Sequence, residues 1–215
     1  MLAAVAVAYL VMLRKSDDGA SVPKWLAWLS VALSVVLVAV MAHSYTMAAR
    51  PAWDSVLWIL YVLGNACVLG PATFQLIMAA AGAGGQPAGR AADAGAPAGL
   101  AALVGAAANA LAALAFAIFL QLSAGSFADV GYYFDPTHPT RAMADAAATV
   151  GAQAPLLWLG AVAVGAVVPL AAAFMGGRSG NWRLWAPVAI VAALAGAVCM
   201  RAAFYNLGLS VFMFY

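Results

Sequence analysis

Long apolar runs constrain the fold of this chain more than any other feature of its sequence. Residues 184–215 hold a single charged side chain, Arg201, and four earlier stretches hold none. Each run has the roughly 20 apolar residues that an α-helix needs to cross a bilayer. The sequence therefore predicts five transmembrane helices. They cover approximately residues 25–43, 56–80, 98–122, 154–175 and 184–209.

Composition supports a membrane protein built from helices. The chain is 67% hydrophobic and 7% charged, whereas a soluble domain carries about 25% charged residues. Long runs without alternation favour helices over a β-barrel, whose strands alternate between apolar and polar residues. We expect an all-α integral membrane bundle, with residues 1–215 forming one transmembrane domain. The net charge of +2 is too small to suggest a nucleic-acid partner.

The N-terminal run is apolar but short. Residues 1–13 would rise only about 20 Å as a helix, which is less than the bilayer core. Arg14 and Lys15 follow this run, whereas a signal peptide carries its positive charges before the apolar core. We expect this segment to be the second half of a transmembrane helix whose first half is absent.

The basic residues predict an orientation. Six of them fall on the side of the turn at residues 14–24, of a Gly/Ala/Pro linker at 82–97 and of a turn at 176–183. Two, Arg50 and Arg141, fall on the opposite side. Because basic residues concentrate in cytoplasmic loops, the first side is expected to be cytoplasmic and the C-terminus external. The six are Arg14, Lys15, Lys24, Arg90, Arg178 and Arg183.

Nothing in the sequence predicts a redox centre or a nucleophile of this chain's own. Cys67 and Cys199 lie inside apolar runs and read as buried thiols. The chain has no CxxC motif, no paired-histidine ladder and no phosphate-binding glycine loop. We expect neither a metal site nor catalytic residues.

Arg201 is the most informative single residue. A lone arginine in an apolar helix is costly, so it usually faces protein, a partner or water. Phe204 and Tyr205 follow at i+3 and i+4, and the helical period places all three on one face. Such a face could recognise a flat molecule with polar edges. Alternatively, Arg201 lies about 25 Å along its helix and could snorkel to the far interface.

Aromatic and basic residues converge on the predicted external side. His43 ends a span and could accept a proton near neutral pH, although a histidine there often simply marks the interface. The loop around residues 132–141 is rich in residue types that are common in interfaces, and an ordered loop is the alternative. The candidates for docking a partner are Trp53, Tyr132, Tyr133, Phe134, His138 and Arg141.

Two stretches resemble the membrane anchor subunit of dimethyl sulfoxide reductase and related molybdopterin oxidoreductases. The first is His43-Ser-Tyr-Thr-Met-Ala-Ala-Arg-Pro-Ala-Trp-Asp-Ser, followed by a span with Gly64-Asn-Ala-Cys-Val-Leu-Gly-Pro-Ala-Thr. The second is Arg201-Ala-Ala-Phe-Tyr in the last span, which is similar to that family's Arg-x-x-Phe-Tyr pattern. The family has eight helices, and this chain resembles the last five and half of the preceding one.

The resemblance implies a role in anaerobic respiration at the cell membrane. Such an anchor holds an iron–sulfur subunit and a molybdopterin catalytic subunit, binds menaquinol and passes its electrons to the iron–sulfur clusters. It binds no redox cofactor itself. The candidate menaquinol-binding residues are Arg201, Tyr205, His43 and Tyr45.

Two other functions fit the sequence. A small helical transporter would use Gly70 and Pro71 as a break in a helix at a midplane site. A passive assembly anchor would bind the partner subunits but no quinone.

The charge distribution generates a first prediction. Single cysteines placed in the 82–97 and 132–141 loops, in a chain lacking Cys67 and Cys199, should react differently with an impermeant thiol reagent on intact cells. The second loop should be labelled and the first should not, because the first lies on the side with more basic residues. Labelling of the first loop alone would reverse the orientation.

Overall fold

The chain is all-helical in the residues that the structure describes. The computed structural model describes residues 2–15, 22–48, 50, 52–81, 88–128 and 146–208, with no strand among them. It forms two compact units, Met1–Ser44 and Tyr45–Tyr215. Five helices in these residues are long and apolar enough to cross a membrane. The predicted all-α bundle is confirmed, and the chain is a multi-pass membrane protein.

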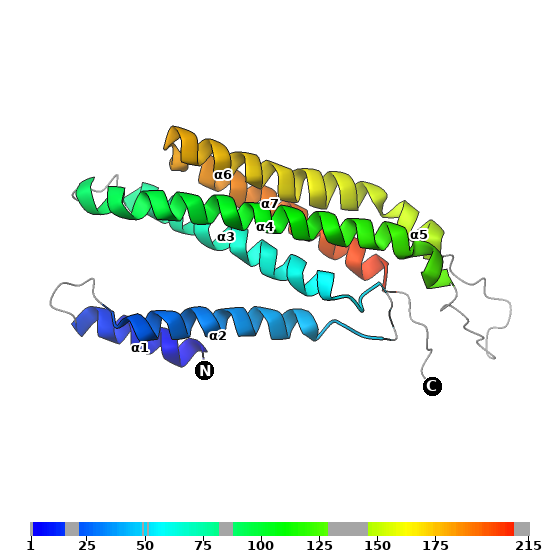
Figure 1. The fold of residues 1–215 in the computed structure, drawn as a ribbon, viewed down its shortest axis with the longest axis horizontal. Coiled ribbons are helices and arrows are strands. Elements are labelled where there is room, and N and C mark those ends of the chain that lie inside the picture. Colours follow the sequence, from blue (N-terminus) through cyan, green and yellow to red (C-terminus); the bar gives the residue numbers. More distant parts are fainter. Residues whose placement is uncertain are drawn as a thin grey trace. The chain divides into compact units, whose positions relative to one another are not determined.

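The first unit is a helical hairpin. Helix α1 (Leu2–Lys15) packs against α2 (Lys24–His43), as Figure 1 shows. Trp25 and Trp28 are exposed in the first turns of α2, where indole rings commonly mark the membrane interface. Among the described residues of this unit, only α2 has the length of a full span, as the sequence predicted.

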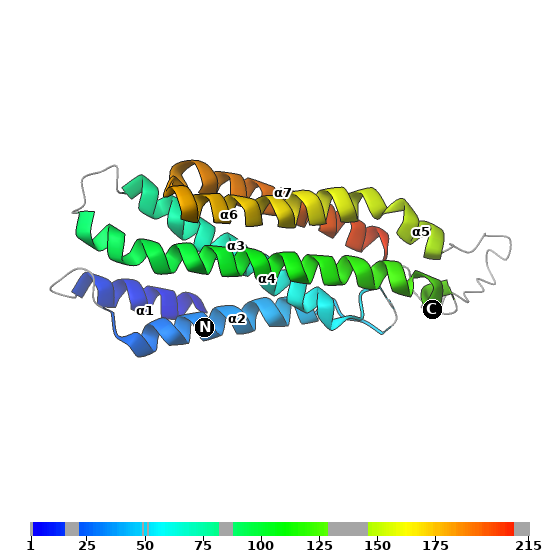
Figure 2. The same ribbon diagram turned by 45° about the horizontal axis from the view of Figure 1, so that its top comes forward.

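In the part of the second unit that the structure describes, four long rods and one short helix form a bundle. Helix α3 packs against α4 and α7, and the η2–α6 rod packs against the same two helices (Figures 1 and 2). Consecutive rods run up and down, as in many four-helix bundles. The bounds are α3 (Val56–Ala81), α4 (Ala88–Ala128), α5 (Ala146–Ala152), η2 (Leu156–Val167), α6 (Val168–Ser179) and α7 (Trp182–Asn206).

The helix ends differ from the prediction at several places, and α4 and α6 also run past their predicted ends to Ala128 and Ser179. Helix α4 begins at Ala88, inside the stretch 82–97 that was expected to be a linker. Alanine has the highest helix propensity, and this stretch is rich in alanine, so the helix extends into it. Helix α7 ends at Asn206, before the expected residue 209.

The core changes character along the bundle. Where α3 begins and α7 ends, it is built from large side chains such as Trp58, Phe116 and Phe204. Towards the other end, the buried residues are mostly alanines, including Ala102, Ala173 and Ala193. Small side chains let helix backbones approach closely within a membrane. The rods are therefore packed tightly at the alanine end and held apart by rings at the end that we call the aromatic end.

Glycines and one amide fix the middle of the bundle. Gly165 of η2 and Gly196 of α7 touch so closely that a Cβ on either would overlap the other backbone. Asn109 of α4 is fully buried, and its Nδ2 donates a hydrogen bond to the Gly165 carbonyl oxygen at 3.0 Å. Segment η2 is a π-helix, in which backbone hydrogen bonds join residues five positions apart rather than four. Its backbone is thus held by α4 on one side and by α7 on the other.

This close contact generates a second prediction. Gly196→Ala should lower the free energy of unfolding by about 1–3 kcal/mol, because the added methyl group must push η2 away from α7. Gly70→Ala is the matched control, since a Cβ at Gly70 meets no atom within 4 Å. That change should be neutral or stabilising by up to about 1 kcal/mol. Equal stability of the two variants in detergent unfolding experiments would contradict the packing described here.

Candidate functional site

The aromatic end of the second unit brings together residues from distant parts of the sequence. Tyr45 and Trp53 come from the segment that precedes α3, and Trp58 lies in the first turn of α3. Arg201 and Phe204 belong to the last turns of α7. These elements meet because α3 begins where α7 ends in an up-and-down bundle.

The guanidinium group of Arg201 lies among four aromatic rings. Its Cζ atom is 4.9 Å from the ring centroids of Tyr45 and Trp58. It is 6.0 Å from the centroid of Phe204 and 5.9 Å from that of Tyr205. A cation within about 6 Å of a ring face is attracted by the ring's quadrupole, and the attraction strengthens where water is excluded. The four rings, here called the aromatic cage, therefore compensate part of the cost of this charge in an apolar helix.

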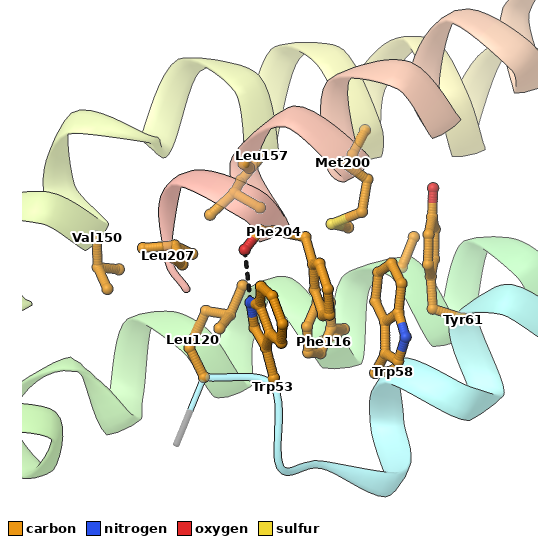
Figure 3. Close-up of a cluster of buried hydrophobic side chains, with 14 of the residues drawn as sticks. Trp53, Trp58, Tyr61, Phe116, Leu120, Val150, Leu157, Met200, Phe204 and Leu207 are labelled. Carbon is orange, nitrogen blue, oxygen red and sulfur yellow. Dashed lines mark hydrogen bonds between the residues drawn. The ribbon is translucent and has the colours of Figure 1, made fainter. Parts of the chain in front are cut away.

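Phe204 is held between two indole rings. Its centroid is 3.8 Å from that of Trp58 and 4.6 Å from that of Trp53, with interplanar angles of 18° and 8° (Figure 3). The Trp53 Nε1–H also donates a hydrogen bond to the Phe204 carbonyl oxygen at 2.7 Å. This stack fixes the last turns of α7 against the start of α3.

The polar groups of the site are only partly satisfied within the chain. Arg201 Nη1 and Trp58 Nε1 are buried and make no hydrogen bond to any residue that the structure describes. Tyr205 is 52% exposed, and its hydroxyl group interacts with Tyr45 and with Arg201. The site thus has a buried side, where Arg201 Nη1 lies among the rings, and an exposed side that carries Tyr205. We call the exposed side the rim.

This arrangement suits a flat ligand that carries oxygen atoms. A guanidinium group is planar, always charged and donates N–H bonds in a fixed fork. Because the cage fixes its plane, less conformational entropy is lost when a ligand oxygen accepts those bonds. The neighbouring hydroxyl groups of Tyr45 and Tyr205 can each donate or accept a hydrogen bond.

The structure brings three of the four candidate ligand-binding residues together. Arg201, Tyr205 and Tyr45 lie within one cluster, with the Tyr45 and Tyr205 ring centroids 6.5 Å apart. His43 is the last residue of α2 in the Met1–Ser44 unit, and its side chain is exposed. The helical period predicts that Phe204 and Tyr205 lie on the same helix face as Arg201. In the structure the Phe204 ring is buried and the Tyr205 ring is exposed, so the two side chains point in different directions.

Of the candidate docking residues, Trp53 alone lies among the described residues. It is 7% exposed and packs within the aromatic end. Its indole ring therefore contributes mainly to the internal structure of the chain. The others, Tyr132, Tyr133, Phe134, His138 and Arg141, lie outside the described residues.

Sequence reasoning missed three participants in this cluster. Trp58 was not singled out in the sequence, yet it is 1% exposed and contacts Arg201. Arg50 lies over the Trp53 ring with its Cζ atom 4.3 Å from the centroid. Gly208 packs so closely on Trp53 and Arg50 that a Cβ there would lie within 3 Å of both. The pairing of Arg50 with Trp53 was accessible from their i+3 spacing, but the role of Gly208 was not.

The described residues contain no group of three or more His, Cys, Asp or Glu side chains that could hold a metal ion. Cys67 and Cys199 are free thiols, and Cys67 is exposed rather than buried as expected. No family model, curated protein or solved structure matches this chain.

The ring stack generates a third prediction. Phe204→Leu should lower the free energy of unfolding by about 1–3 kcal/mol beyond the loss of buried area, because two stacked ring pairs disappear. Phe174→Leu in α6 is the control, since Phe174 is 52% exposed. Unfolding in detergent, followed by near-ultraviolet circular dichroism of the tryptophans, would measure both. A Phe204 variant as stable as the control would show that the stack contributes little.

Proposed function

We propose that this chain is the membrane anchor subunit of a molybdopterin and iron–sulfur oxidoreductase, similar to dimethyl sulfoxide reductase. In this proposal it binds menaquinol, whose electrons pass to the iron–sulfur subunit in anaerobic respiration. The observation that carries the proposal is the caged Arg201 with the exposed Tyr205 hydroxyl beside it. The multi-pass helical bundle supports it, because a quinol is a lipid-soluble substrate. The proposed location is the cell membrane, with the C-terminus external.

The chemistry requires the chain to hold the quinol rather than to carry electrons itself. Menaquinol gives up two protons and two electrons to become menaquinone. In this proposal Arg201 donates hydrogen bonds to one ring oxygen, and the Tyr205 and Tyr45 hydroxyl groups relay both released protons, one after the other, to water. The electrons pass to an iron–sulfur cluster of the partner subunit and then to its molybdopterin subunit.

The cage argues against simple snorkelling of Arg201. Arg201 lies only five positions before the end of α7 at Asn206, so its side chain could reach water directly. Instead the guanidinium group lies among rings, and Nη1 is buried. A side chain held in this way favours a role that depends on the orientation of the guanidinium plane.

The transporter alternative loses its main support. It rested on a broken helix at Gly70 and Pro71, but α3 is continuous from Val56 to Ala81 with Pro71 inside it. A passive anchor without a quinone site remains as an outcome of the experiment below.

Substitution of the rim groups tests the function. In an assembled, membrane-bound complex, Arg201→Lys and Tyr205→Phe should slow menaquinol oxidation while leaving reduction of the terminal substrate by an artificial dye donor unchanged. Loss of one hydrogen bond to a charged group costs about 1.5–3 kcal/mol, or roughly 10- to 150-fold in rate for Arg201→Lys. Lysine retains the charge but lacks the planar fork.

Arg178→Lys is the matched control, because Arg178 is exposed in the last turn of α6. It should leave both activities unchanged. Equal menaquinol turnover by the wild type and both site variants would remove these residues from the site and favour the passive anchor.

A further inference from the structure

Trp53 contacts nearly every member of the site although it is not among the rings closest to Arg201. It stacks on Phe204, and its edge meets the rings of Tyr45 and Tyr205 at centroid distances of 6.4 and 6.1 Å. Arg50 lies over its ring at 4.3 Å. One indole ring therefore links the segment before α3 to the end of α7 (Figure 3).

The hydrogen bond from Trp53 is accepted by a carbonyl group in the last turn of α7. The last four carbonyl groups of a helix have no partner within that helix. At the end of α7, the Ala203 carbonyl accepts from the Leu207 amide, and the Tyr205 carbonyl accepts from the Gly208 amide. The Phe204 carbonyl between them accepts from Trp53 Nε1 at 2.7 Å. Trp53 thus caps α7 from outside the helix.

The chain makes room for this cap. A Cβ at Gly208 would lie 2.7 Å from the Trp53 ring and 2.9 Å from Arg50 Nη1. Only glycine lets the backbone after α7 pass beneath the indole ring. Trp53 is thereby enclosed by Phe204, Gly208 and Arg50, which leaves it little freedom to move.

We infer that Trp53 is a positioning residue of the Arg201 site. By capping α7 and stacking on Phe204, it sets the spacing of the Tyr45 and Tyr205 rings beside Arg201. This role rests on the proposed quinol function for its kinetic consequence, but the spacing itself is a property of the chain.

The first test measures the kinetic consequence in the assembled complex, with menadiol as the water-soluble quinol. Trp53→Phe keeps a ring for stacking but removes the N–H donor. It should raise the KM for menadiol about 2- to 12-fold, the range expected for one neutral hydrogen bond, with the dye-dependent rate unchanged. Trp53→Leu, which also removes the stack, should raise the KM further.

Trp158→Leu provides the matched control. Trp158 is half-buried and packs against the same aromatic core, but it makes no ring contact with Arg201 among the described residues. It should lower the thermal stability as Trp53→Leu does, while leaving the KM unchanged. Equal increases in KM for Trp53→Leu and Trp158→Leu would reduce Trp53 to a general packing residue and overturn the inference.

The second test measures the spacing without any quinol. Cysteines at positions 45 and 205, in a full-length chain with Cys67→Ser and Cys199→Ala, should be joined rapidly by a short bifunctional thiol reagent. Adding Trp53→Leu should slow this cross-linking at least tenfold, and adding Trp158→Leu should not. If the wild type oxidises no quinol, the proposed function fails and cross-linking alone decides the positioning role; unchanged cross-linking with Trp53→Leu would refute it.

Discussion

The need to compensate one positive charge within an apolar helix organises the aromatic end of this protein. A guanidinium group in hydrocarbon is costly, and Arg201 meets that cost with ring faces rather than with a described hydrogen bond at Nη1. The rings must themselves be held in place, and the stack of Trp53, Phe204 and Trp58 does so. The large side chains at this end thus follow from the charge that they surround.

The middle and the alanine end of the bundle are held together in a different way. Apolar helices gain little from burying apolar surface in lipid, so they associate through close packing and interhelical hydrogen bonds. The contact between Gly165 and Gly196 and the bond from Asn109 supply both. Near the end of α3, the Arg183 Nε group donates to the Ala79 carbonyl oxygen at 3.2 Å and ties α7 to α3. These contacts fix the positions of the rods, and thereby also the positions of the helix ends that form the aromatic end.

The sequence predicts the spans well and the site only in part. Apolar length locates the five long helices, and the helical period links Arg201 to Phe204 and Tyr205. It does not show which face of a helix is buried, because these helices are apolar all round. Trp53 was accordingly expected to dock a partner and Trp58 was not singled out, although tertiary contacts bury both. The π-helix also escaped prediction, since alanine, glycine and valine suit an α-helix in a membrane equally well.

The π-helix is a segment in which the chain can lose one residue and remain helical. Each backbone hydrogen bond of η2 encloses one residue more than in an α-helix. A single-residue deletion between Pro155 and Pro169 can be absorbed by converting a π turn into an α turn. The same deletion in α7, upstream of Arg201, would rotate the guanidinium group by about 100° relative to the rest of that helix and turn it away from its rings. Related chains should therefore vary in length within η2 and keep an invariant count of residues in α7.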